Sequence, residues 1–114
     1  MKKLLIALCL IAPSAYAADC SKAKNTQDSL ACLNSEVKQL KLELSKVLNS
    51  AITQTEAKSE FKASQAKWLA YKEQQCGEFV VADSQGSPAA IEYDLHCQST
   101  LYKQRISLLK QFFN

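Results

Sequence analysis

Four cysteines place the strongest constraint on how this 114-residue chain can fold. They are Cys20, Cys32, Cys76 and Cys97, and a fifth, Cys9, lies in an N-terminal segment that we expect to be removed. An even set of cysteines in a short exported chain is typical of a disulfide framework. A domain this small buries a modest core, so we expect two disulfides to contribute to its stability, each on the order of 3 kcal/mol.

The N-terminal segment has the three parts of a secretory signal peptide. Two lysines form a basic region, residues 4–12 form an apolar region, and Ala15-Tyr16-Ala17 is a small-x-small cleavage site. The apolar region is shorter than the roughly twenty residues that span a bilayer. We therefore expect residues 1–17 to be a signal peptide, cleaved after Ala17. The mature domain is then residues 18–114, and it is periplasmic or secreted.

A lipoprotein is the alternative, because cysteines lie near the signal. Cys20 follows Asp19, an acidic residue where a lipobox has a small one, and Cys9 lies too early, inside the apolar region. No later segment of the sequence is long and apolar enough to suggest a membrane span. We therefore favour a soluble exported protein over an anchored one.

The charge balance argues against two classes of partner. The chain has 14 Lys and Arg against 11 Asp and Glu. Two of the basic residues belong to the signal, so the mature domain has 12 against 11, a formal charge of +1. No basic stripe interleaved with aromatic residues occurs. Nucleic acid and an anionic membrane surface are therefore not expected as partners.

The first predicted helix runs from about Thr26 to Ile52. Seven apolar residues in this range, called here the apolar seam, recur at alternating spacings of three and four: Leu30, Leu33, Val37, Leu40, Leu44, Val47 and Ala51. This narrow pattern is typical of a coiled-coil interface. Asp28 and Ser29 near the start favour a helix N-terminus.

A second helix is predicted at about residues 55–76. The apolar seam lapses after the first helix, and Thr53 with Glu56 fits a capping box in which Thr53 is the N-cap. We therefore predict a break at residues 50–54. A single helix over residues 26–76 is the alternative, because no Gly or Pro enforces the break.

A third helix follows the one predicted loop, residues 77–88, which holds both glycines and the only mature proline. Ser87 as N-cap and Pro88 at the first helical position suit its start. The residues expected to face inward are Phe61, Trp68 and Leu69 in the second helix and Ile91, Leu95, Tyr102, Ile106, Leu109 and Phe113 in the third, with Leu101, Leu108 and Phe112 broadening the apolar surface. The prediction is an all-α domain, an antiparallel three-helix bundle or hairpin stapled by two disulfides.

The helices would bring all four thiols to one end, so three disulfide pairings remain open. We favour Cys20–Cys32 with Cys76–Cys97, because these pairs close shorter loops and suit the hairpin. The rival is Cys32–Cys76 with Cys20–Cys97. A zinc site is disfavoured, since no Cys-x-x-Cys occurs and His96 is the only histidine.

Residues 65–76 carry the most distinctive motif of the chain. Gln65, Trp68, Lys72 and Cys76 are spaced by 3, 4 and 4, which places them on one face of one helix. This motif resembles the LprI-like family of exported lysozyme inhibitors. The other positions that carry the resemblance are Cys20, Thr26, Gln27, Cys32, Tyr71, Cys97, Thr100, Arg105 and Leu108. The family's usual Arg-Asp is Lys72-Glu73 here, which keeps the charges but loses the guanidinium fork.

The resemblance implies an exported protein that binds a protein partner in the bacterial envelope, with lysozyme-type muramidases as the expected target. No enzyme is expected, because His96 is the single histidine and no Ser or reduced Cys has a recognisable partner arrangement. No cofactor is expected either. The oligomeric state is left open.

Several motif side chains also have expected environments. Trp68 is expected in the core, with Gln65 as the neighbour that satisfies its indole N–H. Tyr71 and Lys72 are expected to reach solvent. Arg105 is expected to pair with Glu73 or Asp94 in an ordinary salt bridge.

The predicted loop is the expected recognition element. If the target is lysozyme, Asp83, Ser84 or Gln85 would enter the cleft between its two catalytic carboxylates. Tethering at the loop base by Cys76 and Cys97 lowers the ordering cost on binding. The alternative function is an envelope assembly module that binds a protein partner through the apolar seam.

Overall fold

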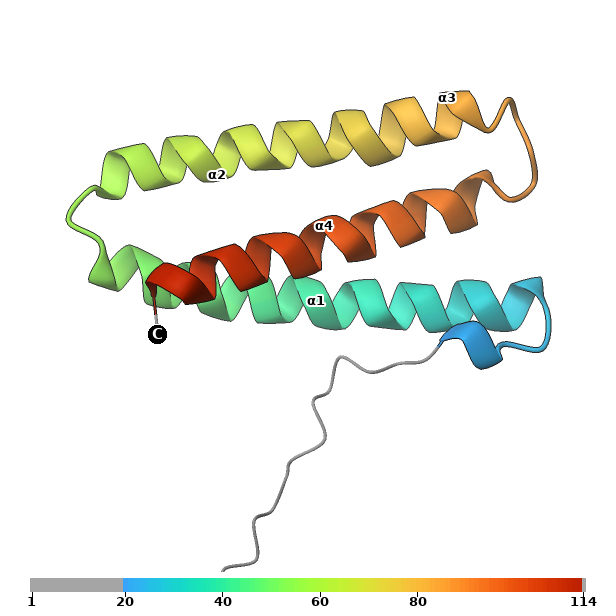
Figure 1. Cartoon of the computed structure of the whole chain (residues 1–114), viewed down its shortest axis with the longest axis horizontal. Helices are drawn as coiled ribbons and strands as arrows, with labels where there is room; N and C mark the ends of the chain where they lie inside the picture. The colour runs from blue at the N-terminus through green and yellow to red at the C-terminus, as the bar shows by residue number, and fades with distance from the viewer. Residues whose placement is uncertain (1–19, 114) are drawn as a thin grey trace, which may run out of the picture.

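The computed structural model describes residues 20–113, and those residues form helices and turns with no strand (Figure 1). The elements in chain order are η1 (Cys20–Lys22), α1 (Thr26–Gln54), α2 (Lys58–Lys72), the π-helix η2 (Glu73–Val80), α3 (Val81–Asp83) and α4 (Ala90–Phe112). α2, η2 and α3 follow one another without a gap and form one rod. The predicted all-α fold with three principal helical segments is confirmed, whereas the predicted signal peptide lies outside the described residues.

α1 and α4 lie side by side and run in the same direction (Figure 1). Two ion pairs join them: Lys103 Nζ lies 2.6 Å from Glu36 Oε1, and Lys110 Nζ lies 2.7 Å from Glu43 Oε1. The step is seven residues on both helices. An equal seven-residue step on two parallel helices is the register of a coiled coil.

The apolar seam of α1 is covered by α4. Leu33 and Leu40 are each only 1 % exposed, and Leu30 is the one seam residue that is half-buried rather than buried. The facing stripe of α4 follows the same alternation of three and four: Glu92, Leu95, Ser99, Tyr102, Ile106, Leu109 and Phe113. The core of the molecule is therefore the α1–α4 interface.

The facing stripe of α4 was not recognised in the sequence, because two of its positions are occupied by the polar residues Glu92 and Ser99. Ser99 is buried, and Glu92 accepts a 2.7 Å hydrogen bond at Oε1 from the buried hydroxyl of Ser29. Ile91, predicted to face inward, is one residue off the stripe, about 100° around the helix, and is 62 % exposed. Ser29 thus serves the α1–α4 contact, and the N-cap of α1 is Asn25.

The other residues that were predicted to contribute to the apolar surface but are exposed lie on α2 and near the end of α4. Leu69, also predicted to face inward, follows Trp68 by one residue and is 43 % exposed. Leu108 and Phe112 are exposed as well. α2 has few apolar side chains on its inner face, so it adds little to the core.

The break between the first two helices is real, but the predicted capping box is wrong. Thr53 lies inside α1, where its hydroxyl donates a 2.8 Å hydrogen bond to the carbonyl of Ser50. The connector is residues 55–57, in which the Thr55 hydroxyl accepts from the backbone N–H of Ala57. The helix therefore ends after Gln54, just beyond the predicted range.

The predicted loop at residues 77–88 is also largely wrong, because residues 77–83 continue the helical rod. Trp68, Lys72, Cys76 and Val80 follow at steps of four, which would drift by about 40° per step around a 3.6-residue helix. The wider turns of η2 offset this drift and keep the stripe facing α4. Gly77 lies inside η2 and does not interrupt the rod.

α4 begins two residues later than predicted, and its N-cap is Ala89 rather than Ser87. The turn that leads into it spans residues 84–89, and the Ser87 hydroxyl accepts a hydrogen bond from the backbone N–H of Ala89. Pro88 lies in this turn rather than in the helix, which begins at Ala90.

The α1–α4 interface predicts a sharp contrast between two leucines two residues apart. Leu40→Ala should lower the free energy of unfolding by about 2–5 kcal/mol, because it empties a fully buried site. Leu42→Ala is the matched control: Leu42 is 66 % exposed, so the change should stay within about 0.5 kcal/mol. Urea unfolding of the oxidised protein measures both, and equal losses would contradict the assignment of the core.

Candidate protein-binding site

The motif residues of α2 and η2 form a stripe that contacts α4. Tyr102 of α4 is the centre of this contact: its ring lies 5.5 Å from that of Trp68, and its hydroxyl accepts a 3.0 Å hydrogen bond from Lys72 Nζ. One turn further, Cys76 is covalently bonded to Cys97. Trp68 is half-buried between the helices.

Lys72 was expected to reach solvent, but it is only 5 % exposed. Burial acts to lower the pKa of Lys72, but its hydrogen bonds to Tyr102 and Glu73 outweigh that effect and raise the pKa above its ordinary value. The ammonium group therefore remains charged beneath the surface, held by a phenol and a solvent-exposed carboxylate.

Arg105 is buried as well, and its partner is not the expected carboxylate. Its Nε donates a 3.0 Å hydrogen bond to Oε1 of Gln65, and its guanidinium carbon lies 5.9 Å from the centre of the Trp68 ring. Nη2 is buried and has no hydrogen-bond partner among the described residues. Burial lowers the pKa of Arg105. A buried donor without a partner costs about 1–3 kcal/mol.

The remaining motif positions differ in exposure. Tyr71 is 53 % exposed, as expected. Thr100 is exposed too, and its hydroxyl donates to the carbonyl of His96 within α4. The motif is thus mainly a set of contacts that hold the α2–η2 rod against α4.

α1 begins and α3 ends at the same end of the molecule, called here the disulfide end (Figure 1). Both disulfides lie toward this end, because Cys20 and Cys32 flank the start of α1 and Cys76 precedes the end of α3 by seven residues. Cys20 is bonded to Cys32 with a Cα–Cα distance of 5.6 Å, and Cys76 to Cys97 with a distance of 5.4 Å. The favoured pairing is confirmed and the rival pairing is wrong. Every cysteine in the described part of the chain is bridged.

The chain reverses direction at the disulfide end in a tight turn, residues 83–86, called here the tip. Gln85 and Gly86 have φ angles of 51° and 74°, the left-handed region that lets a short turn close. Asp83 and Gln85 are exposed, whereas Ser84 is half-buried and its hydroxyl donates to the carbonyl of Val81. Of the three predicted recognition residues, two therefore present free side chains to solvent.

A hollow of about 560 Å³ lies beside the tip, between the rod and α4. Asp83 and Ser84 form one wall, and Tyr93 and His96 of α4 form the other. Tyr93 is 52 % exposed, and Phe79 on the rod near this end is 57 % exposed. Exposed aromatic side chains are typical of protein-binding surfaces, and sequence analysis did not single these out.

The charges of the chain are segregated in space, although their sum is near zero. Residues 73–102, which include the tip, contain five carboxylates and no Lys or Arg: Glu73, Glu78, Asp83, Glu92 and Asp94. Residues 38–72 and 103–113, most of which lie toward the opposite end, contain ten Lys and Arg against three Asp and Glu. One of the ten, Lys72, is paired with Glu73. The positive charges of Lys22 and Lys24, which lie before α1 at the disulfide end, only partly offset the negative charge there. The net charge alone concealed this asymmetry.

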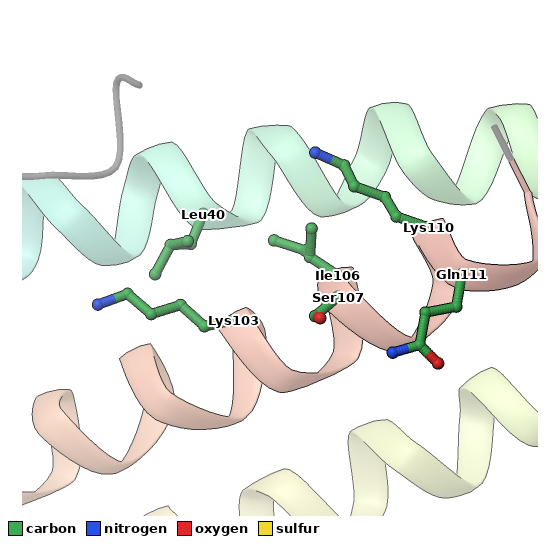
Figure 2. Close-up of a pocket in the computed structure, with 6 residues that line it drawn as sticks. All are labelled: Leu40, Lys103, Ile106, Ser107, Lys110 and Gln111. Carbon is green, nitrogen blue, oxygen red and sulfur yellow. The ribbon is translucent and has the colours of Figure 1, made fainter. Parts of the chain in front are cut away.

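Figure 2 shows a groove of about 390 Å³ along the α1–α4 interface, with Leu40 and Ile106 between the helices and Lys103 and Lys110 beside them. The two amines are the partners of Glu36 and Glu43 described above. The charges of Lys103 and Lys110 are therefore already neutralised by the ion pairs that join α1 to α4. For this reason the groove is less suited than the tip to binding a partner.

Neither a metal-binding cluster nor a membrane-spanning helix occurs among the described residues. No group of three or more His, Cys, Asp or Glu side chains in this part of the chain is placed to hold a metal ion. None of the described helices has the length and apolar character to cross a membrane.

Comparison with known families accounts for this arrangement. The family model described as Lysozyme inhibitor LprI matches residues 17–109, nearly the whole chain. The chain belongs to the LprI family. No curated protein and no solved structure matches it. That description names an inhibitor rather than a catalyst, and the target that it names, lysozyme, is a protein. Together with two disulfides, it is consistent with an extracytoplasmic protein.

The contact of Lys72 with Tyr102 in this LprI-family chain can be tested with a pair of tyrosine variants. Tyr102→Phe removes the acceptor of a buried ammonium, so the free energy of unfolding should fall by about 1.5–3 kcal/mol. Tyr93→Phe removes the same atom from a half-exposed ring and should change it by less than about 0.5 kcal/mol. Thermal and urea unfolding distinguish the two, and a neutral Tyr102→Phe would show that the contact is dispensable.

Proposed function

We propose that this chain is an exported inhibitor of lysozyme-type muramidases, acting in the bacterial envelope as a non-catalytic binding protein. The observation that carries the proposal is the match of the LprI lysozyme-inhibitor family over residues 17–109. The signal-like segment at residues 1–17 and the two disulfides support export to an oxidising compartment.

The distribution of charge supports the tip as the part that meets the enzyme. A net charge of +1 would give little attraction toward a basic lysozyme. Of the five carboxylates within residues 73–102, Glu73 is paired with Lys72, and the other four provide a local negative field toward the disulfide end. Complementary charge of this kind accelerates encounter and orients the partners.

The shape of the tip suits a cleft. Gln85 lies in the turn with an exposed side-chain amide, and Asp83 lies two residues before it. In the proposed complex the Gln85 NH₂ donates to the ionised catalytic carboxylate, and its carbonyl oxygen accepts from the protonated catalytic acid. The Cys76–Cys97 bridge near the base of the turn restricts its motion and lowers the ordering cost on binding.

The assembly-module alternative loses its motive. It required the apolar seam of the first helix to be available to another chain. That seam is covered by α4 within one molecule, and Leu33 and Leu40 are 1 % exposed.

Removing the free groups of the tip should weaken inhibition without unfolding the protein. We expect Asp83→Ala with Gln85→Ala to weaken inhibition of a lysozyme at least tenfold, or about 1.4 kcal/mol. The melting temperature should change little, since both side chains are exposed. The measurement is lysis of a cell-wall suspension by lysozyme, titrated with oxidised mature protein.

The matched control removes one exposed carboxylate and one exposed amide elsewhere, with Glu60→Ala and Gln104→Ala. It should inhibit as the parent does. If the parent, the tip variant and the control inhibit equally, the tip is not part of the interface with lysozyme. A parent that inhibits no lysozyme tested would overturn the proposed function itself.

A further inference from the structure

A separate groove lies between α1 and α2, near the connector at residues 55–57 and away from the tip. Its apolar walls include Leu48 and Ile52 of α1 and Phe61 and Leu69 of α2. Its volume is about 340 Å³, at the lower end of the range of roughly 300–1,000 Å³ found for small-molecule sites. We call it the α1–α2 groove.

One wall of the α1–α2 groove connects directly to a buried cation. Gln65 lines the groove, and its Oε1 accepts the Nε–H of Arg105. Arg105 is 8 % exposed, and its Nη2 is the one buried side-chain polar atom without a partner among the described residues. The guanidinium therefore lies immediately behind a side chain of the groove wall.

The geometry of the guanidinium shows which hydrogen-bond acceptor Arg105 lacks. Nε–H and one N–H of Nη2 lie on the same edge of the planar group and point the same way, which matches the two oxygens of a carboxylate. Gln65 offers a single amide oxygen to this edge and occupies only Nε. A carboxylate in its place would accept from both nitrogens, and such charged bidentate pairs are stronger than a neutral hydrogen bond.

The surroundings of the groove also favour an anion. Lys62 stands at its rim, and no Asp or Glu is among its lining residues. The groove thus combines apolar walls with one cation at the rim and another behind the wall. A molecule with a hydrocarbon body and one carboxylate is complementary to both features.

We propose that the α1–α2 groove binds a medium-chain fatty acid. The alkyl chain lies along Leu48, Ile52, Phe61 and Leu69. The carboxylate displaces the Gln65 amide from Arg105 and accepts from Nε and Nη2. This site is independent of lysozyme inhibition, because it lies in the basic half of the molecule rather than at the acidic tip.

Trp68 supplies the readout. It is the only tryptophan, and its ring lies 5.9 Å from the guanidinium carbon, so its fluorescence should report a carboxylate that arrives there. Oxidised mature protein is titrated with dodecanoate below its micelle concentration. A saturable change in Trp68 emission and a higher melting temperature are expected. Dodecanol, with the same chain and no carboxylate, should bind at least tenfold more weakly.

Gln65→Glu is the decisive variant, because glutamate has the shape of glutamine and brings its own carboxylate to the Arg105 fork. It should fold, melt at or above the parent temperature, and lose affinity for dodecanoate at least tenfold. Gln104→Glu adds the same charge at an exposed site of α4 and should bind dodecanoate as the parent does.

Three results would overturn the proposal. They are no saturable response to dodecanoate, equal binding of dodecanol, and unaltered binding by Gln65→Glu. A peptide with an apolar C-terminal sequence is tested in parallel, and binding of the peptide without binding of dodecanoate would replace the lipid with a protein partner. Lysozyme inhibition is measured on the same samples, so a failure of either proposal is recognised separately.

Discussion

The parallel pairing of α1 with α4 is the contact on which the rest of the molecule depends. It buries the apolar seam, and Leu33, Leu40 and Leu44 are among its most enclosed side chains. Two parallel helices cannot be joined by a short turn. After α1 the chain must therefore run back along the length of the molecule before α4 begins. The α2–η2–α3 rod is that return, and it packs on α4 with much less apolar surface of its own.

Because the rod has so few apolar side chains, specific contacts replace a broad hydrophobic interface. A disulfide, a buried ammonium bonded to a phenol, and a guanidinium bonded to an amide hold it to α4. These are the residues of the LprI motif. We infer that the motif specifies how the rod is attached to α4. The wider turns of η2 contribute to this attachment, since they keep residues spaced by four on the face that contacts α4.

The same arrangement divides the molecule into two unlike ends. The disulfide end carries the tip and the carboxylates of residues 73–102, and the opposite half carries most of the lysines. A near-neutral chain thereby has a strongly dipolar surface. The proposed lysozyme contact uses the acidic end, and the proposed fatty-acid groove uses the basic half. The two could operate without competing for surface.

The sequence by itself determined the helical class, the apolar seam and the disulfide framework, because periodic apolar residues and cysteine number act locally and leave a direct pattern. It also placed Gln65, Trp68, Lys72 and Cys76 on one face. Only the tertiary structure decided the rest. The α4 stripe includes polar Glu92 and Ser99, whose burial depends on contacts across helices. Gly77 continues a helix because α4 lies alongside to hold the rod. Lys72 and Arg105 are buried because Tyr102 and Gln65, distant in sequence, offer them acceptors. Residue spacing and composition cannot predict these hydrogen-bond partners, because they lie 30 and 40 residues away in the sequence.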